Sequence, residues 1–386
     1  MNGHPNEVFQ VYDLYLDVQG PVFVGCGKQL TKKEYLFRGD QMWVIDVERF
    51  YSYVRKKGMA SAFERYLLDP FSGSLNQWLT EMRINAAEIQ PYLQYAIGRE
   101  RDTVQYNGGG RYSGYQGSRK TGRTEIHTFV KDAFGLPYVP GSSVKGMLRT
   151  ILFGADLLQR QDAYAKDAQQ VKREIEQLDK RRGLRSMKQA EHVRFHTLNQ
   201  LHEKPKDFDN AVNDELSGLI VSDSDPLALT DLTLCPKIDV HVNGAVSALP
   251  MQRECLKPGT RIHCTLTVDR TKLKLTGEEI TRAAQVFLKR YNAVFAEKFG
   301  REYRLMDGSV LLGGGSGFVS KTVLYDLFSP EEGLCLTKTV FDRTTKGKSA
   351  HKSERDRVVS PRVLKCTTVR GKTYQFGVCK LQVKAR

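Results

Sequence analysis

Two stretches of the sequence alternate between apolar and polar residues, and this alternation limits the fold more than any other feature. In YDLYLDV (12–18), Leu14, Leu16 and Val18 share one face. In TRIHCTLTV (260–268), every second residue is apolar in the same way. Successive side chains of a strand point to opposite sides of a sheet, so this period of two predicts strands with one buried face and one polar face.

Helices are predicted between these strands, because apolar residues recur there at helical spacing. The clearest helix is EEITRAAQVFLKRYNAVFAEKFG (278–300), in which Ile280, Ala284, Phe287 and Tyr291 mark one face. Further helices are predicted at residues 60–97, 142–158 and 160–204. Further strands are predicted at residues 216–224, 319–325 and 373–385, and residues 41–54 read as a strand that runs into a helix.

With the insertions set aside, the elements follow the order strand, helix, strand, strand, helix, strand. This is the βαββαβ order of the ferredoxin-like or RRM fold. We therefore expect an α+β fold with helical insertions, a β-hairpin and a C-terminal extension. The core, within residues 1–326, is expected to be assembled from residues 8–20, 137–158 and 215–326. The expected additions are an α/β insertion with a glycine-rich loop (30–130), a charged helical hairpin (160–212) and a basic C-terminal region that resembles a degenerate second RRM-like unit (327–386).

An Asn-Gly pair in the middle of KIDVHVNGAVSALPM (237–251) predicts a β-hairpin. Asn-Gly flanked by alternating residues is the strongest short-range hairpin signal, because both residues accept positive φ in a type I′ turn. We therefore expect a protruding β-ribbon. Its tip is formed by His241, Val242, Asn243 and Gly244.

The net charge is +15, from 59 basic and 44 acidic residues, and residues 337–372 alone carry 11 basic and 3 acidic side chains. A surplus of this size indicates a polyanionic partner, either nucleic acid or an acidic membrane face. No run of about 18 apolar residues is present to span a membrane, and no long cationic amphipathic helix favours its surface. The charge therefore favours nucleic acid.

The cysteines and the N-terminus indicate a cytoplasmic protein. The N-terminal MNGHPNEVFQ lacks the charged and apolar regions of a secretory signal. The seven cysteines are scattered without C-x-x-C or framework spacing. This pattern fits free thiols in a reducing cytosol and excludes metal ribbons and redox motifs.

Two glycine-rich segments are candidates for binding RNA. The first, residues 107–123, combines glycines and tyrosines with basic side chains, which suits single-stranded RNA because cations follow phosphates while aromatic rings stack on bases. Its basic side chains are Arg111, Arg119, Lys120 and Arg123. The second, LLGGGSGFVSK (311–321), places four glycines between a predicted helix and a predicted strand, where backbone N–H groups can converge on a phosphate. A flexible linker is the alternative.

The predicted helix start in PYVPGSSVKGMLRT (137–150) raises a question of charge. With Ser142 as the N-cap, the third helical position carries Lys145 in place of the usual Glu or Gln. Arg149 repeats the positive charge one turn later on the same face. Cations at this end of a helix need a compensating anion, and we expect that anion to come from outside the chain.

Neither a metal nor a cofactor is expected. His192 and His196 share a helix face, but no third ligand stands at a suitable distance for zinc. Asp223 and Asp225 in VSDSDP follow a strand, where Asx and Ser residues usually form turns, so we favour a turn over a metal pair. The segment 311–321 is not a Walker loop, because no Gly-Lys-Ser/Thr ends it.

Catalysis without metal would require a histidine, because RNA cleavage needs a general acid or base with a pKa near neutrality. His241 and His263 lie on the polar faces of predicted strands, where contact with RNA or solvent suits them better than proton transfer. His127 is the remaining candidate, and it has no evident partner in the sequence.

Several of these motifs together resemble the RAMP superfamily of CRISPR-associated proteins. They occur in the order PYVPGSSVKGMLRT, VSDSD, the hairpin, LKPGTRIHCTLTVD and LGGGSGF. PVFVGCGKQLTKKEYLFRGDQMWVID is similar to the branch that supplies the fifth Csm subunit of type III-A effector complexes. The resemblance covers residues 9 to 326, and residues after it are less distinctive.

The resemblance implies a non-catalytic subunit that binds the guide (crRNA), caps its 3′ end and supports its 3′ maturation. The implied partners are crRNA, target RNA, the backbone RAMP subunit, the small helical subunit and host nucleases recruited for trimming. In the backbone subunit a loop aspartate cuts target RNA. The comparable region of this chain is dominated by Lys and Arg, so that activity is not transferred to Asp40.

The resemblance also implies roles for particular residues. The hairpin tip would be a thumb that wedges into the guide–target duplex, and the guide backbone would be held by the second glycine-rich segment and the helix start. The expected RNA-binding residues are Gly141, Ser142, Ser143, Lys145, Arg149, Gly313, Gly314, Gly315, Ser316, Gly317, Lys321, Arg111, Arg119, Lys120, Arg123 and Arg253. The alternative is a metal-independent endoribonuclease that processes CRISPR repeat RNA through His127.

Overall fold

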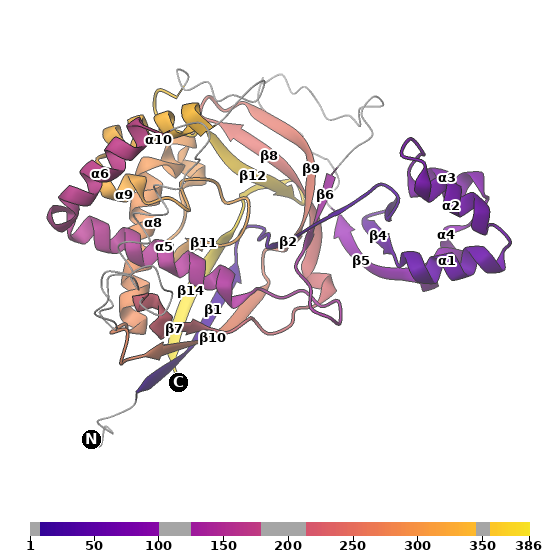
Figure 1. The fold of residues 1–386 in the computed structure, drawn as a ribbon, viewed down its shortest axis with the longest axis horizontal. Helices are drawn as coiled ribbons and strands as arrows, with labels where there is room; N and C mark the ends of the chain where they lie inside the picture. Colours follow the sequence, from indigo (N-terminus) through magenta and orange to yellow (C-terminus); the bar gives the residue numbers. More distant parts are fainter. Residues whose placement is uncertain (1–7, 100–124, 179–213, 345–355) are drawn as a thin grey trace.

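The computed structural model describes residues 8–99, 125–178, 214–344 and 356–386. It contains one five-stranded and one nine-stranded β-sheet, with helices packed around them (Figure 1). Within these ranges, no helix combines the length and the apolar character needed to cross a bilayer. The predicted RNA contacts Arg111, Arg119, Lys120 and Arg123 lie outside the described residues, as do His192 and His196.

The five-stranded sheet forms the centre of the larger part of the molecule. Its strands are antiparallel to their neighbours, in the order β11 (Ser309–Leu311), β14 (Val378–Ala385), β1 (Phe9–Val18), β10 (Arg261–Asp269) and β7 (Leu219–Val221). The two alternating runs are therefore strands, as predicted. Their apolar residues form the buried face, with Leu14, Leu16 and Ile262 at 0% exposure.

Helices α5 (Gly141–Gln159) and α8 (Gly277–Val294) cover this apolar face (Figure 1). The start of α8 is fixed by a capping box, in which Thr276 accepts from the Glu279 N–H and the Glu279 side chain accepts from the Thr276 N–H. The predicted stripe of α8 is confirmed, because Ile280, Ala284 and Phe287 are buried against the sheet.

The predicted α+β, ferredoxin-like order is confirmed, with a different closing strand. The elements β1, α5, β7, β10 and α8 follow one another as expected. The predicted strand at 319–325 is wrong, because this segment turns and enters the short helix α9 (Leu324–Leu327). Ser320 Oγ donates to the Gly317 carbonyl and Thr322 Oγ1 accepts from the Leu324 N–H, and such local bonds compete with strand pairing. Strand β14 instead takes the antiparallel place beside β1.

The C-terminal region is therefore divided between both sheets. After helix α10 (Pro330–Thr344), strands β12 (Val363–Val369) and β13 (Lys372–Gln375) join the nine-stranded sheet, and β14 completes the five-stranded one. This topology differs from the expected second RRM-like unit in 327–386. Strand β12 pairs with β8, and β14 pairs with β1. These partners are distant in the sequence, and no local pattern predicted the pairing.

The nine-stranded sheet carries the predicted hairpin. Its main path runs β2 (Gly25–Leu30), β6 (Glu125–Phe129), β9 (Val246–Leu256), β8 (Leu232–His241), β5 (Leu93–Arg99), β4 (Gln41–Ile45) and β3 (Tyr35–Arg38), and β12 and β13 extend it from β8. Strands β8 and β9 form the hairpin, but it is not a free ribbon, because β12 pairs with β8 from Ile238 to His241. Ile238 and Val240 are accordingly buried.

The turn of this hairpin also differs from the prediction. The Gly244 N–H donates to the His241 carbonyl, the His241 N–H donates to the Ala245 carbonyl, and Gly244 alone has positive φ, at +78°. This is the pattern of a type I turn followed by a left-handed glycine, rather than the type I′ turn predicted for Asn243-Gly244. Asn243 uses its side chain instead, accepting from the Ala245 N–H.

Residues 35–99 form a separate α/β lobe at one side of the molecule (Figure 1). The lobe has its own apolar core around Phe50, Phe63 and Trp78. It contains β3, β4 and β5 with the helices α1 (Val47–Lys56), α2 (Ala60–Leu68), α3 (Leu75–Glu81) and α4 (Ala86–Ile89). Residues 93–97 are part of β5 rather than helical as predicted, because they pair with β4 in the lobe.

The described part of the charged insertion, residues 160–178, packs on helix α10. Helix α6 (Ala165–Glu176) buries Val171 and Ile175 against Leu336 and Val340 of α10. Lys172 and Glu332 add an exposed ion pair between the same helices, with 2.7 Å between Nζ and Oε1. The remainder of the predicted hairpin lies outside the described residues.

Candidate nucleic-acid interface

Two of the predicted RNA-binding segments meet at one pocket of about 420 Å³. The start of α5 contributes Ser142 and Ser143, and the second glycine-rich segment contributes Gly313, Gly314 and Lys321. The other lining residues are Val24, Gly25, Gly146, Met147, Thr150, Leu311 and Ser320. Segments about 170 positions apart in the sequence are thus brought together at one pocket.

The glycine-rich segment is a tightly held loop rather than a flexible linker. It follows strand β11, not a helix as predicted, and Gly313, Gly315 and Gly317 all have positive φ, between +80° and +93°. The Gly314 N–H donates to the Phe23 carbonyl over 2.6 Å. A Cβ on Gly313 would overlap that carbonyl oxygen, so both the backbone angle and the close approach require glycine here.

Arg253 lies directly beneath this loop. A Cβ on Gly315 would overlap its Nη1, and the guanidinium lies 4.9 Å from the ring centroid of Phe23 and 5.6 Å from that of Phe376. Its Nε and Nη1 are buried and have no hydrogen-bond partner in the described part of the chain. Buried donors without acceptors are costly, so this geometry points to an acceptor supplied by a ligand.

Other cations surround Arg253. Burial lowers the pKa of Lys237 and Lys321, and the charge of Arg253 lowers each pKa further. Lys365 lies in the same region and is paired with Asp239 over 2.8 Å. The fixed cations Arg253, Lys237, Lys321 and Lys365 therefore outnumber the carboxylates described beside them, which creates a strong preference for an anion.

His127, the candidate for catalysis, lies at the edge of this cation cluster. It pairs with Arg253 across strands β6 and β9, and its ring meets Phe23 edge-on at 6.4 Å. Burial, followed by the charge of Arg253, lowers its pKa. Its Nε2 lies 3.5 Å from the Gln29 amide nitrogen and 3.8 Å from a Glu125 oxygen. His127 is therefore held neutral next to an anion site.

Lys145 and Arg149 lie away from this pocket. Arg149 pairs with Asp214 over 2.6 Å, and the pKa of Lys145 is lowered by burial against the partly compensating charge of Asp214. The predicted N-cap, Ser142, is also wrong, because α5 begins two residues earlier, with Pro140 as N-cap and Gly141 as the first helical residue. Lys145 is thus the fifth helical residue rather than the third, so it does not occupy the capping-box position.

The anion at the start of α5 comes from this chain. Asp223 Oδ1 accepts from the Gly141 N–H over 2.8 Å. A Cβ on Gly141 would overlap the carbonyl oxygens of Val221 and Ser222, so glycine is needed for this close contact. The expectation that the compensating charge must come from outside the chain is therefore wrong for the helix start.

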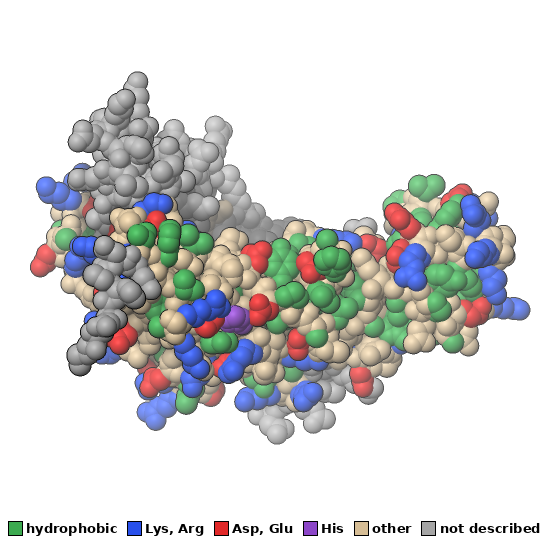
Figure 2. All heavy atoms as spheres, turned by 90° about the horizontal axis from the view of Figure 1, so that it is seen from below, with side chains coloured by type: hydrophobic (Ala, Val, Ile, Leu, Met, Phe, Trp, Pro, Cys, Tyr) green, Lys and Arg blue, Asp and Glu red, His purple; other side chains and the backbone are tan. Residues whose placement is uncertain are grey.

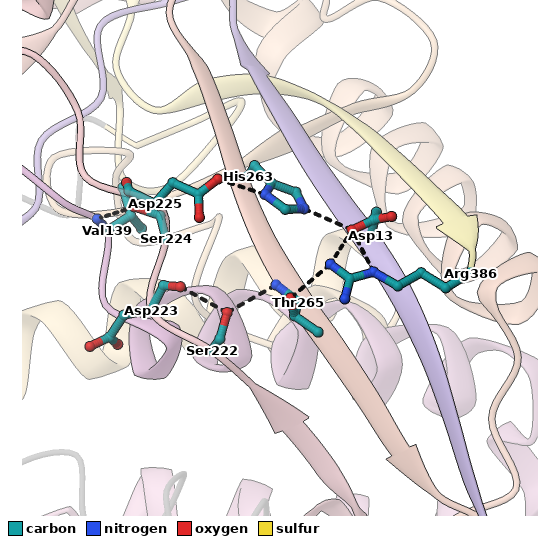
Figure 3. Close-up of polar contacts among 9 residues, drawn as sticks. All are labelled: Asp13, Val139, Ser222, Asp223, Ser224, Asp225, His263, Thr265 and Arg386. Carbon is teal, nitrogen blue, oxygen red and sulfur yellow. Dashed lines mark hydrogen bonds and ion pairs between the residues drawn. The ribbon is translucent and has the colours of Figure 1, made fainter.

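The VSDSD segment (221–225) that supplies this carboxylate is connected to the outer face of the central sheet (Figure 3). Ser224 Oγ accepts from the Val139 N–H, and Asp225 Oδ2 lies 2.8 Å from His263 Nδ1. The other ring nitrogen of His263 lies 2.8 Å from Asp13 Oδ1, which also accepts from Arg386. The turn predicted for this segment is wrong, because Ser222 to Asp225 continue alongside β10, where the Ser222 N–H donates to the Thr265 carbonyl and the Asp225 N–H to the His263 carbonyl.

His263 should make the stability of the protein depend on pH. Hydrogen bonds to Asp225 and then Asp13 raise its pKa above 6.5, because only the imidazolium donates to both carboxylates. The stabilisation is fully present below pH 6.5 and is lost as the pH rises through the raised value. We expect the melting temperature to fall over that range in the wild type and to change less in His263→Gln. Equal slopes in both proteins would contradict this role.

Asp13 sets the acid limit of the same network. Arg386 and then His263 lower its pKa to about 2, so its contribution to stability is present above pH 3.8 and is lost as the pH falls towards 2.

The outer face of the central sheet around Asp13 is balanced in charge, because Arg261 also pairs with Asp17 over 2.6 Å. The face of the molecule drawn in Figure 2 accordingly shows basic and acidic side chains interspersed over the main body, with hydrophobic side chains towards the lobe.

The hairpin tip lines a second pocket, of about 390 Å³. Its lining includes His241, Val242 and Asn243 of the hairpin tip together with Arg357 and Arg362. Burial lowers the pKa of His241, and Arg362 adds to this effect. The predicted thumb residues are thus next to arginines of the C-terminal region.

Sequence reasoning missed part of the cation cluster. Lys237 and Lys365 lie on paired strands, and Phe23 and Phe376 flank Arg253, yet these residues are far apart in the sequence. Lys237 lay on the polar side of the alternating hairpin run, which was the one signal available. Among the described residues, no three His, Cys, Asp or Glu side chains are grouped so that they could hold a metal.

Comparisons with known proteins agree on one family. The model of the RAMP superfamily matches residues 15–370. A Mycobacterium tuberculosis (strain CDC 1551 / Oshkosh) protein called "CRISPR system Cms protein Csm5" is 30% identical, over 98% of this chain and 99% of its own length.

Two solved structures share the fold. A chain in a cryo-EM structure of a Csm-crRNA-target RNA ternary complex of a type III-A CRISPR-Cas system has a TM-score of 0.63 and 19% identity, over 96% of this chain and 100% of its own length. The crystal structure of Csm5 from T.onnurineus has a TM-score of 0.59 and 19% identity, over 95% of this chain and 99% of its own length. At such identities the likeness concerns the fold.

Proposed function

This chain belongs to the RAMP superfamily and, within it, to the family of Csm5 proteins, and from that premise we propose that it is an RNA-binding subunit of a type III-A CRISPR effector (Csm) complex. The observation that carries the proposal is the cation cluster beneath the glycine-rich loop. Arg253 has two buried donors that find no acceptor among the described residues, and its neighbours Lys237 and Lys321 are also cationic. A phosphodiester supplies both the charge and the acceptors that this site lacks.

The predicted RNA contacts divide into two groups on this proposal. Ser142, Ser143, Lys321 and the glycine-rich loop with Ser316 lie around or next to the pocket and Arg253, so they would hold the guide backbone. Lys145 and Arg149 lie on the side of α5 that faces Asp214, so they would add long-range attraction rather than direct contacts. The protein would read the backbone while base pairing carries the sequence.

We also propose the finer role that the resemblance implies. The subunit would cap the 3′ end of crRNA, support 3′ maturation through recruited host nucleases, and contact target RNA, the backbone RAMP subunit and the small helical subunit. The hairpin tip at Asn243-Gly244, with Arg357 and Arg362 beside it, is the part suited to a guide–target duplex. The cytoplasm is the proposed location, and the seven free cysteine thiols fit it.

The subunit is proposed to have no nuclease activity of its own. The alternative, a metal-independent ribonuclease, is favoured only by the position of neutral His127 beside Arg253. Incubation with repeat RNA in EDTA separates the two. The proposal predicts intact RNA, whereas discrete cleavage that disappears in His127→Ala would establish the alternative.

The salt dependence of RNA binding tests the proposed function. For the full chain and a guide-length single-stranded RNA, the logarithm of the affinity should fall linearly with the logarithm of salt concentration, with a slope of about 0.7 per phosphate contact. Lys237→Ala/Lys321→Ala should lower the slope by about one to two such contacts. The matched control is Lys380→Ala/Lys384→Ala on strand β14. Equal slopes in the two double variants would contradict the assignment of the site.

A further inference from the structure

The pocket between α5 and the glycine-rich loop differs in chemistry from the cation cluster beside it. Hydroxyl groups of Ser142, Ser143, Thr150 and Ser320 line it, and Lys321 is the one charged residue in the described part of its lining. Among the lining residues that the structure describes, none carries an aromatic ring or an amide side chain. Its volume of about 420 Å³ is within the range of roughly 300–1,000 Å³ found for small-ligand sites.

The hydroxyls of Ser142 and Ser143 are available to a ligand. Neither makes a hydrogen bond within the described part of the chain, whereas Thr150 Oγ1 donates to the Gly146 carbonyl and Ser320 Oγ to the Gly317 carbonyl. The two serines lie in the first turn of a helix fixed by Asp223, so their positions are set before any ligand arrives. A fixed pair of hydroxyls can both donate to and accept from a ligand hydroxyl.

These features suit a sugar better than a base. Bases are recognised by stacking on aromatic rings and by hydrogen bonds to their edges, and the described lining residues supply neither rings nor amides. Glycines have no side chain, so a lining that contains them leaves room for a ribose to approach the backbone closely. Gly146, Gly313 and Gly314 belong to the lining of this pocket. Lys321 in the lining and Arg253 under the loop would hold the phosphates next to such a sugar.

We propose that this pocket receives a ribose of the bound strand and that Ser142 and Ser143 recognise its 2′-hydroxyl. The site would then select RNA over DNA of the same sequence, since the 2′-hydroxyl is the group that distinguishes them. This inference rests on the proposed function, because the pocket can select a sugar only in a strand that the cation cluster holds.

The test compares oligouridylate with oligodeoxyuridylate of guide length, so that base and charge are constant. The full-length wild type should bind the RNA more tightly. Ser142→Ala/Ser143→Ala should weaken RNA binding by about 5- to 20-fold and leave DNA binding within about two-fold, because a neutral hydrogen bond contributes a factor of a few. Ser61→Ala, an exposed serine in α2 of the lobe, is the control and should change neither affinity.

Each other outcome has a distinct meaning. Equal losses for RNA and DNA would overturn the inference and assign the serines to the phosphate backbone. Unchanged affinities for both would also overturn it, with the proposed function intact. Wild-type protein that binds neither strand would contradict the proposed function itself.

Discussion

Replacing Arg253 by methionine is expected to weaken single-stranded RNA binding by about 10- to 100-fold while leaving the folded protein at least as stable. A hydrogen bond to a charged group contributes about 1.5–3 kcal/mol, and Arg253 offers two buried donors to a phosphate. Within the described ranges of the free protein these donors are unpaired, and the neighbouring Lys237 and Lys321 repel the guanidinium. Methionine keeps the apolar contacts with Phe23 and Phe376 without that cost.

The measurement is RNA affinity by equilibrium titration together with the thermal midpoint of the free protein. Arg261→Met is the matched control, since Arg261 also lies over an aromatic ring, that of Tyr15, but pairs with Asp17 on the outer sheet face. It should lose little RNA affinity. A large drop in the midpoint for Arg253→Met with unchanged RNA binding would show that Arg253 serves the fold instead.

Replacing Glu254 by leucine should have the opposite effect and destabilise the protein by about 3–5 kcal/mol. The Glu254 side chain is fully buried, and its carboxylate accepts from Lys131 Nζ at 2.5 Å, Tyr95 Oη at 2.6 Å and the Phe129 N–H at 2.9 Å. These contacts connect β9 to β5 and β6. Removing the carboxylate leaves the Lys131 ammonium, which is only 13% exposed, without its partner.

A double-mutant cycle tests this prediction by denaturant unfolding. Lys131→Met in the Glu254→Leu background should recover part of the lost free energy of unfolding, because replacing both members of a buried pair is far less costly than removing one. Glu64→Leu, at an exposed hydrogen bond to Tyr51, is the control and should cost little. Additive effects at Glu254 and Lys131 would contradict the assigned coupling.

Arg253 and Glu254 are neighbours on one strand and point to opposite faces of it, which explains their opposite predicted effects. The Glu254 carboxylate is paired with Lys131, Tyr95 and the Phe129 N–H. By contrast, Nε and Nη1 of Arg253 have no hydrogen-bond partner among the described residues. Residues that cost stability in this way are typical of binding sites. Comparing the two substitutions therefore separates effects on RNA binding from effects on stability at two adjacent residues of β9.

Local signals predicted much of the fold. Alternation found β1 and β10, helical spacing found α8, and the Asn-Gly pair found the β8–β9 hairpin. Predictions failed where distant pairing decides structure. Residues 93–97 became a strand through pairing with β4, and the closing strand of the core came from the C-terminal end of the chain.

For the candidate site too, local patterns predicted some residues, and the predictions failed where distant contacts decide the structure. Composition and motif singled out the glycine-rich loop, Ser142, Ser143 and Lys321, and the fold brings them together. The charge argument for Lys145 and Arg149 failed at the helix start because a carboxylate 82 positions away, on Asp223, supplies the anion. The cluster around Arg253 depends on strand register and on Phe23 and Phe376, none of which a linear pattern reveals.

The most direct measurement is a cryo-EM structure of the assembled effector complex that contains this chain and its guide RNA. The account predicts backbone phosphates within hydrogen-bonding distance of Arg253 and of the loop from Gly313 to Gly317. Guide density on the outer face of the central sheet, over Tyr15 and His263, with the Arg253 donors still unpaired, would contradict it.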